Sequence, residues 1–501
     1  MYKLQIRNFF KNKSDMGKLM ILIGFLTFIP VIVIPFYFYE KQYFLAFFIP
    51  SAASVILGFA VCCLIKNSAG GASGNRSESF ERTLKSGSLT VLFAWGWGIL
   101  AGSIPFLFFG NLNFLKCLFE SASGWTTTGF TVINVAETPH IFLFHRSFMQ
   151  FCGGLGVVLM MAMIIQNKQS VNLYSFEGHN DRLTPSVIKT SRTVFILYFV
   201  IFSAGVLLYT VCGMPFFESV IHSMSALSTG GFSSRAGGIG EYNSVLIECV
   251  TILIMLLGMT NFAVLLLLAR RKFKQAGMVS EVKFLGVLLL FVIPVMVFSF
   301  CYGLSVSFGE SVRQSVFNAV SILSTTGFTT VNYTGAPVFM LLIIIMLMLV
   351  GGGIGSTSGG LKLNRLYLLF RGAGINVQKK LSTEDRTFSH KYYRAQGKIE
   401  IDGHIINDTY AYAFIYFLIF IVTAILLCFT ENAGGGNAIF AAAALTGTTG
   451  ISFGIFGPSS SAATLIVGII GMIIARLEIN IIIIGICSAF TGIRAQSARR
   501  R

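Results

Sequence analysis

Charged residues are scarce in this sequence. They account for 11% of its 501 residues, against 54% for hydrophobic residues, whereas soluble domains carry about 25% charged residues. A chain with so few charges cannot cover the surface of a water-soluble fold of this size. The composition therefore excludes a soluble protein and predicts an integral membrane protein whose apolar surface faces the lipid bilayer.

Residue patterns that carry catalysis or metal binding are also lacking. The nine cysteines include no C-x-x-C pair and mostly lie in apolar runs, which argues against a disulfide framework or a zinc site. The six histidines include no H-E-x-x-H motif, and no paired carboxylates lie inside an apolar run. We therefore expect neither an enzyme nor a covalently bound cofactor. A membrane enzyme or a carrier for an organic solute is the disfavoured alternative.

The net charge of +17 does not indicate a nucleic-acid-binding protein, because the basic residues lie in short segments between apolar runs. Cytoplasmic loops of membrane proteins carry such an excess of Lys and Arg. With an even number of spans, both chain ends lie on one side, together with most of the 37 basic residues, including those in 270–274, 362–398 and 499–501. The sequence therefore predicts that both termini are cytoplasmic.

Four near-copies of one short polar stretch organise the chain. Each copy has Thr, then Thr or Gly, then Gly and a bulky apolar residue. The candidate site residues of the four copies are Thr127, Thr128, Gly129, Phe130, Thr229, Gly230, Gly231, Phe232, Thr325, Thr326, Gly327, Phe328, Thr448, Thr449, Gly450 and Ile451. The copies recur at intervals of about 100 residues, which indicates a repeated structural unit.

Each copy has the same neighbours along the chain. An apolar run comes first, then a half-length segment that ends in the motif, then a second apolar run; in the first unit these are Leu89–Phe109, Phe114–Trp125 and Ile141–Ile165. A helix needs about 20 residues to cross a bilayer, so each half-length segment predicts a re-entrant helix. Before the first unit, Leu19–Tyr39 and Phe44–Leu64 predict a hairpin of two spanning helices.

The predicted fold is therefore an all-α integral membrane protein. It consists of the two-helix hairpin with its cytoplasmic link (1–86), repeat 1 (87–170), repeat 2 (171–275), repeat 3 (276–400) and repeat 4 (401–501). The segments expected in the later repeats are Val194–Cys212, Phe216–Leu227 and Val245–Leu268; Phe284–Tyr302, Ser311–Leu323 and Val338–Phe370; and Tyr410–Phe429, Asn437–Leu445 and Ala462–Phe490.

Loops that follow the four short helices are suited to a cation if they meet at one axis. Non-helical backbone is tolerated at membrane depth where protein or a water-filled cavity satisfies it. Backbone carbonyl oxygens can replace the hydration shell of a cation, and the end of each short helix is partly negative. The alternative is that these are small-residue contacts between packed helices. Four copies at the same place in four units favour four pore loops around a central pore.

The second apolar run of the third unit is interrupted by a glycine-rich stretch. The residues assigned to this break are Gly351, Gly352, Gly353, Gly355, Ser356, Thr357, Gly359 and Gly360. The stretch lacks the G-K-[ST] ending and the preceding strand of a phosphate-binding loop. A helix kink is the other interpretation, although so many glycines exceed what a kink needs. We predict a flexible intramembrane loop in the pore, just below the four motif loops, at 350–361.

Arg476 and Glu478 lie inside the last apolar run. Charged side chains at membrane depth are costly, so they are functional candidates by default. Both are therefore candidates for a functional role in the predicted pore. The alternative is that they pair with other groups and hold helices together.

These motifs together make the chain resemble the Trk/Ktr/HKT superfamily of cation transporters, particularly the TrkH-type subunits of bacterial potassium uptake. The resemblance implies four helix–pore-loop–helix repeats around one potassium path, with potassium as the substrate. It also implies a homodimer in the bacterial cell membrane and a cytosolic nucleotide-binding regulatory ring of the TrkA/KtrA type. Similar members carry a gating loop at the place of Gly351–Gly360 and a pore arginine at the place of Arg476. The resemblance therefore implies a gate formed by the loop 350–361 together with Arg476 and Glu478.

In this superfamily, a glycine in each loop accompanies potassium selectivity, and a serine in the first loop accompanies sodium transport in some plant members. The present chain has all four glycines. It departs from the pattern at Gly230, where the other loops have threonine, and at Ile451, where the others have phenylalanine. The second hypothesis is therefore a sodium-preferring or ion-coupled cation symporter of the same fold.

Overall fold

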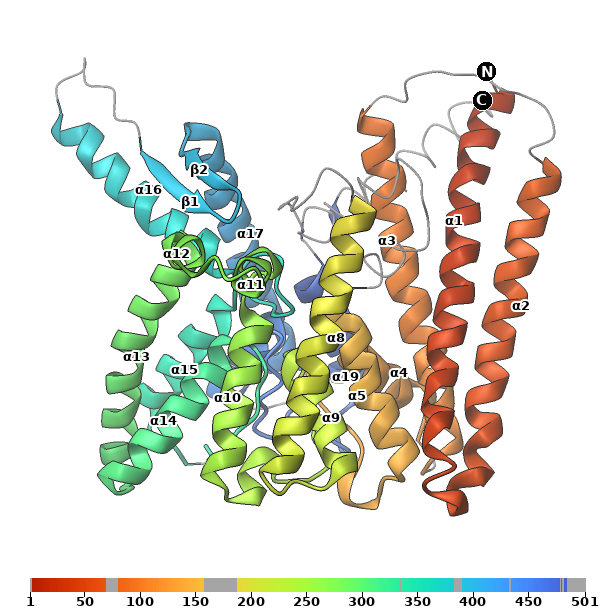
Figure 1. Ribbon diagram of the computed structural model, residues 1–501, viewed down its shortest axis with the longest axis horizontal. Helices are drawn as coiled ribbons and strands as arrows, with labels where there is room; N and C mark the ends of the chain where they lie inside the picture. The colour runs from red at the N-terminus through yellow and green to blue at the C-terminus, as the bar shows by residue number, and fades with distance from the viewer. Residues whose placement is uncertain are drawn as a thin grey trace.

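The computed structural model describes residues 2–68, 80–110, 112–156, 187–333, 335–382, 390–431, 434–477, 479 and 482–483. Nearly all regular structure in these ranges is helical (Figure 1). Glu478, one of the predicted gate residues, lies outside them. The expected spans Ile141–Ile165 and Ala462–Phe490 also run into residues outside them.

The leading hairpin consists of α1 (Tyr2–Phe28) and α2 (Phe44–Ser68), with the short 3₁₀ helices η1 (Ile29–Val33) and η2 (Phe38–Tyr43) between them. Glu40 at its tip is buried, and its carboxylate accepts hydrogen bonds from the backbone N–H groups of His140 and Ile141, both at 2.8 Å. A carboxylate at a helix N-terminus satisfies free N–H groups and the helix dipole. Glu40 therefore attaches the hairpin to the helix that begins at His140.

After the hairpin, the chain repeats one order of elements: a long helix, a short helix, a loop and a further helix. These are α3 (Phe80–Ser103), α4 (Phe114–Trp125) and α5 (His140–Leu155); α8 (Val187–Val211), α9 (Phe216–Leu227) and α10 (Val245–Met259); α13 (Ser280–Gly303), α14 (Phe308–Leu323) and α15 (Val338–Val350); and α17 (Gly403–Glu431), α18 (Gly435–Thr446) and α19 (Ala462–Arg476). Short helices α4 and α9 begin and end where the sequence predicts them.

The prediction of one continuous span over Val245–Leu268 is wrong. Helix α10 ends at Met259, and α11 (Phe262–Ala269) leaves at an angle of 113°. The side chain of Asn261 accepts a hydrogen bond from the backbone N–H of Ala263 at 2.8 Å and so caps a new helix. The carbonyl of Met259 accepts a hydrogen bond from the N–H of Gly353 at 2.8 Å. The glycine-rich stretch thus supplies a hydrogen-bond donor for a backbone carbonyl at the bend.

The predicted interruption of the third unit is confirmed. Helix α15 ends at Val350 and α16 (Leu363–Leu381) begins at Leu363, with irregular backbone between them. Gly351 and Gly360 approach each other so closely that a β-carbon on Gly360 would lie 2.8 Å from the Gly351 backbone. Both have positive φ, of 73° each. Glycine is needed at this crossing point because a side chain would fit neither the space nor the backbone angle.

The all-α prediction misses one antiparallel hairpin, formed by β1 (Lys391–Arg394) and β2 (Gly397–Glu400). Tyr392 is buried and pairs in register with Ile399, while Lys391 and Glu400 form an exposed ion pair at 3.2 Å. This alternation of inward and outward side chains is the strand period. The hairpin lies at the same end of the molecule as α16 and α12 (Phe273–Met278) (Figure 1).

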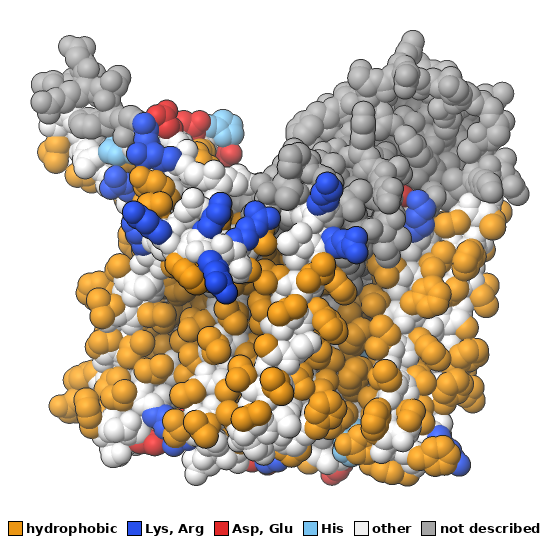
Figure 2. Space-filling view, in the orientation of Figure 1, with side chains coloured by type: hydrophobic (Ala, Val, Ile, Leu, Met, Phe, Trp, Pro, Cys, Tyr) orange, Lys and Arg blue, Asp and Glu red, His pale blue; other side chains and the backbone are white. Residues whose placement is uncertain are grey.

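Six helical segments in the described ranges are long and apolar enough to cross a membrane, or seven if α10 and α11 form one span. They are Asp15–Val33, Phe38–Leu64, Ser88–Phe108, Lys189–Val211, Ser280–Gly303 and Gly403–Glu431. Figure 2 shows a broad band of exposed hydrophobic side chains, with Lys and Arg gathered above it over α11, α12 and the start of α8. A surface of this kind faces lipid with its basic edge at one membrane interface.

Candidate functional site

The four predicted loops form a closed ring. One glycine of each loop, here called its ring glycine, packs against a carbonyl oxygen of the next loop. The ring glycine of the fourth loop packs against a carbonyl oxygen of the first loop. A β-carbon added at the glycine would lie 2.4 Å (Gly129 to Gly230), 2.0 Å (Gly231 to Thr326), 1.7 Å (Gly327 to Thr449) and 2.1 Å (Gly450 to Thr128) from that oxygen. No β-carbon fits at such distances, so only glycine permits a ring this tight.

Each loop begins in the same backbone conformation. The first threonine has positive φ in all four: 54° at Thr127, 53° at Thr229, 62° at Thr325 and 55° at Thr448. Its N–H donates to the carbonyl three residues back, and the next N–H donates to the carbonyl five residues back, at 2.8–3.2 Å. These two bonds are the Schellman ending of a helix, in which glycine normally takes the left-handed position. Threonine there is strained and is held by its surroundings.

The ring glycine two residues later is left-handed as well, with φ of 92°, 79°, 79° and 71° in loop order. Alternation of left-handed and ordinary residues turns successive peptide planes, which can bring carbonyl oxygens to one side. The short helices α4, α9, α14 and α18 end directly before the loops, so the partly negative end of each helix lies at the ring. The local electrostatics favour a cation.

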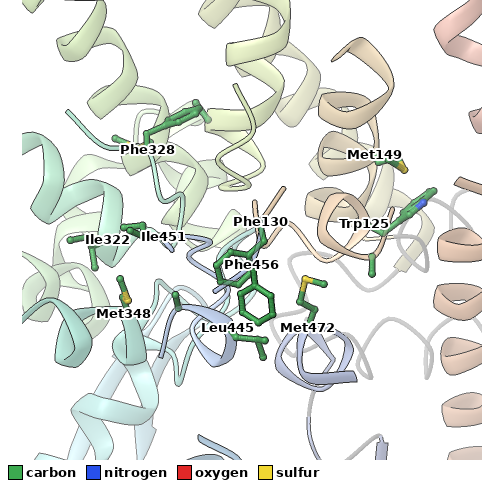
Figure 3. Close-up of a cluster of buried hydrophobic side chains, with 14 of the residues drawn as sticks. Trp125, Phe130, Met149, Ile322, Phe328, Met348, Leu445, Ile451, Phe456 and Met472 are labelled. Carbon is green, nitrogen blue, oxygen red and sulfur yellow. The ribbon is translucent and has the colours of Figure 1, made fainter. Parts of the chain in front are cut away.

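The bulky residue that follows each ring glycine is buried. Phe130, Phe232 and Phe328 are at most 2% exposed, and Ile451 is 7% exposed. Figure 3 shows Phe130 against Phe456, whose rings are 4.5 Å apart between centroids. Aromatic packing of this kind supports the loops from behind. These four residues were predicted as part of the site, and their side chains lie buried behind the loops.

A buried ion pair joins the first two loops. Nε of Arg146 on α5 lies 2.7 Å from Oε1 of Glu120 on α4, and both side chains are at most 2% exposed. The Glu120 carboxylate also accepts the N–H of Val132 at 2.9 Å, and the Arg146 guanidinium lies 3.9 Å above the Phe232 ring. Sequence reasoning missed this pair, because an intervening loop separates the two residues along the chain.

A cavity of about 680 Å³ opens over the ring, lined by all four ring glycines and by charged residues of the loops beyond them. Arg235 pairs with Glu218 at 3.1 Å, and the Tyr242 hydroxyl donates a hydrogen bond to the same carboxylate. Burial, together with this bond to Glu218, raises the pKa of Tyr242. The phenol therefore stays protonated and keeps donating at neutral pH.

The glycine-rich loop Gly351–Gly360 contacts the third and fourth ring loops at Thr325 and Thr448. Neither threonine lines the large cavity. Oγ1 of Thr357 lies 3.0 Å from the carbonyl oxygen of Leu227 and 2.9 Å from that of Gly258, and these two acceptors share its single hydroxyl proton. The N–H of Gly359 donates to the Thr325 hydroxyl at 3.0 Å. A β-carbon on Gly359 would lie 2.1 Å from the Thr448 hydroxyl. The loop thus lies against the ring, at residues that do not line the large cavity.

Two basic side chains hold carbonyls of this loop. Arg476 at the end of α19 donates from its guanidinium to the carbonyl of Thr357 and, at 2.7 Å, to the carbonyl of Gly153 on α5. The Lys362 ammonium donates to the carbonyl of Ser358. Both line a small cavity of about 60 Å³ beneath the loop. Two positive charges therefore lie next to the glycine-rich loop.

The remaining predicted gate residues lie within the loop itself. Gly352, Gly353 and Ser356 are buried, and the Ser356 hydroxyl donates to the carbonyl of Gly353 at 2.6 Å. The N–H of Phe262 donates to the carbonyl of Gly355 at 3.3 Å. No group of three or more His, Cys, Asp or Glu in the part of the chain that the structure describes is placed to hold a metal ion.

A helical membrane protein in which four glycine-bearing loops meet in one ring belongs, by fold and site, to the class of proteins that pass small cations. The family model described as TrkH, cation transport protein, matches residues 52–488. This match covers most of the chain. The chain therefore belongs to the TrkH family of cation transport proteins, as its sequence motifs predicted.

Individual relatives agree with this assignment. The chain is 30% identical over 479 residues to the Trk system potassium uptake protein TrkG of Escherichia coli, which covers 92% of the chain and 94% of that protein. It is 29% identical over 470 residues to an uncharacterized cation transporter of Methanocaldococcus jannaschii, covering 93% and 92%. It is 29% identical over 367 residues to the Trk system potassium uptake protein TrkH of Salmonella typhimurium, covering 71% and 75%.

The fold has a solved counterpart. The crystal structure of the potassium transporter TrkH from Vibrio parahaemolyticus superposes with a TM-score of 0.80 over 94% of this chain and 98% of that chain, at 24% sequence identity. This likeness establishes the fold.

Proposed function

We propose that this protein takes up potassium across the cell membrane through the ring of four loops, which acts as its selectivity filter. The observation that carries the proposal is the closure of the ring, in which each of the four glycines packs on a carbonyl of the next loop. A narrow ring of carbonyl oxygens at the ends of four helices can replace the water around a potassium ion. The relatives TrkG and TrkH are named as potassium uptake proteins.

In the proposed mechanism, potassium enters from the large outer cavity, loses water in the ring and then meets the closed glycine-rich loop. The loop and the positive charge of Arg476 hold the path shut, because a fixed cation in a low-dielectric passage repels the permeating ion. Opening requires that Thr357 and Gly359 leave the ring. The four helix–pore-loop–helix repeats around one pore are part of this proposal.

The remaining expectations belong to the same proposal. The protein would form a homodimer in the cell membrane, with both termini in the cytoplasm and the four loops opening outward. A cytosolic nucleotide-binding ring would regulate it, since the relatives are named as components of Trk systems. The basic segment that contains α12, and the hairpin of β1 and β2, lie at the end of the molecule that such a regulator would face (Figure 1).

Uptake of radioactive rubidium into liposomes that contain the purified protein tests the proposal, with competition by potassium or sodium. Potassium should compete strongly and sodium weakly. Gly129→Ser should weaken this preference about tenfold, because the added β-carbon would lie 2.4 Å from the Gly230 carbonyl and must widen the ring. Gly457→Ser is the matched control, since an added β-carbon there meets no atom within 4 Å.

The outcomes separate the hypotheses. Equal competition by sodium and potassium in the unaltered protein would reject potassium selectivity and favour the sodium-preferring or ion-coupled symporter. An unchanged preference in Gly129→Ser would reject the filter, whatever ion is carried. A changed preference in Gly457→Ser would show that the effect of serine is not specific to the ring.

A further inference from the structure

The second loop of the ring lacks an internal brace that two other loops have. In the first loop the Thr128 hydroxyl hydrogen-bonds to the Thr126 hydroxyl at 2.8 Å, and in the third the Thr326 hydroxyl bonds to the Ser324 hydroxyl at 2.7 Å. The corresponding residue of the second loop is Gly230, which has no hydroxyl to offer. Its backbone has the same left-handed residues as the other loops, and hydrogen bonds from outside the loop hold it.

The space of the missing side chain is filled by Gln150 from α5. A β-carbon on Gly230 would lie 2.3 Å from Cδ of Gln150, so no larger residue fits while Gln150 is in place. Gln150 has no exposed surface. A buried amide needs hydrogen-bond partners, since leaving its polar atoms unpaired costs about 1–3 kcal/mol. The glycine in the second loop is therefore explained by a side chain from the preceding unit.

The amide of Gln150 bonds to the loop on both sides of Gly231. Its Nε2 donates to the carbonyl of Gly230 at 2.6 Å, and its Oε1 accepts from the N–H of Phe232 at 3.2 Å. The same oxygen accepts from the Ser225 hydroxyl on α9 at 2.9 Å. These partners fix the orientation of the amide, because a carbonyl needs the NH₂ group and an N–H donor needs the oxygen.

The Gly230 carbonyl is also the oxygen against which Gly129 of the first loop packs. Gln150 thus holds a ring oxygen in position and ties it to α9. We propose that Gln150 is a positioning residue of the ion-selective ring, and that it does for the second loop what the threonine hydroxyl does within the first and third. This inference rests on the proposed function, because a selectivity role presupposes that the ring is the filter.

Selectivity depends on the number and spacing of the coordinating oxygens, so a loosened second loop should discriminate less well. We expect Gln150→Leu, which keeps the volume but not the hydrogen bonds, to lower the preference for potassium over sodium about two- to tenfold, the factor that one lost hydrogen bond represents. Gln314→Leu is the control, because its amide donates to Glu310 outside the ring. Rubidium uptake with sodium competition measures both.

A compensating pair gives the sharper test. Gly230→Thr alone should abolish most uptake, because its side chain collides with Gln150. Gly230→Thr combined with Gln150→Ala should recover it, because the new hydroxyl can bond to Ser228. Ser228 stands two residues before position 230, as Ser324 stands before Thr326. Only protein that elutes as a single species in detergent is assayed, so that misfolded variants are not read as inactive.

Recovery of uptake in the double variant supports the positioning role even if the unaltered protein prefers no ion, an outcome that would overturn only the proposed potassium function. The positioning role is overturned if the double variant is no more active than Gly230→Thr. It is also overturned if folded Gln150→Leu keeps the full preference of a selective unaltered protein.

Discussion

Arg476 combines charge and hydrogen bonding at the glycine-rich loop, the proposed gate. One guanidinium nitrogen donates to the carbonyl of Thr357 in the loop and another to the carbonyl of Gly153 on α5. A hydrogen bond from a charged donor contributes about 1.5–3 kcal/mol. The residue therefore both stabilises the closed loop and places a positive charge on the proposed ion path.

Replacement of Arg476 should raise potassium flux. Arg476→Ala removes the charge and both bonds, so rubidium uptake into liposomes should increase about tenfold or more, the factor that one charged hydrogen bond represents. Arg476→Lys keeps the charge but not the two-pronged geometry, and it should give an intermediate flux. Uptake in Arg476→Ala at or below that of the unaltered protein would contradict a closing role.

Some roles of single residues could be predicted from the sequence and others could not. The four glycines and the threonines before them were predicted as loop residues, because they recur in register. The positive φ of the first threonine was not predicted, since the Schellman ending usually has glycine at that place. Nor was the role of Gln150, because it depends on a contact between residues 80 positions apart. Local patterns do not encode which distant side chain fills a gap.

At the scale of elements, the first turn of α13 connects two parts that the sequence did not link. The carboxylate of Glu281 accepts the N–H of Ile354 in the glycine-rich loop at 3.0 Å. The neighbouring Ser280 hydroxyl accepts the N–H of Tyr393 on β1 at 3.0 Å. Adjacent residues of α13 thus bind the β1–β2 hairpin and the glycine-rich loop.

Loss of the Glu281 contact should loosen the loop. Glu281→Ala leaves the Ile354 N–H without this acceptor, so the loop should open more often and rubidium uptake should rise about two- to tenfold, the range for one lost hydrogen bond. Glu137→Ala, at an exposed carboxylate of the outer loop between α4 and α5, is the control and should change nothing. Faster deuterium exchange in a peptide containing Ile354 would confirm local opening. Unchanged exchange and flux would exclude the connection.

The elements themselves were predictable to different degrees. Bounds of α4 and α9 follow from apolar segments that end at polar loops, and the structure confirms them. The bend after Met259 and the strand Lys391–Arg394 were not predicted. Both depend on partners outside their own segment, since Gly353 completes the hydrogen bonds of the bend. The hydrophobic periodicity of the sequence therefore predicts long helices better than it predicts helix breaks and β-hairpins.

At the scale of the whole molecule, polar side chains connect the first unit to the second and the second to the third. Gln150 reaches from the first unit to the second loop, and Arg313 on α14 pairs with Glu248 on α10 at 2.8 Å. Arg146 packs its charge on Phe232 of the second loop while pairing with Glu120 of its own unit. Distant parts of the chain are thus joined by polar groups in an otherwise apolar interior.

The Arg146–Glu120 pair should be the most costly of these contacts to break. Arg146→Leu leaves the fully buried Glu120 carboxylate without its cation, which should lower the free energy of unfolding by about 3–5 kcal/mol. Lys391→Ala breaks the exposed pair with Glu400 and should cost at most about 1 kcal/mol. Thermal unfolding of both variants in the same detergent compares them. Equal melting temperatures would mean that Arg146 does not stabilise the folded ring. If Arg146→Leu melts lower, adding Glu120→Gln should recover part of the loss, because the remaining group no longer carries a buried unpaired charge.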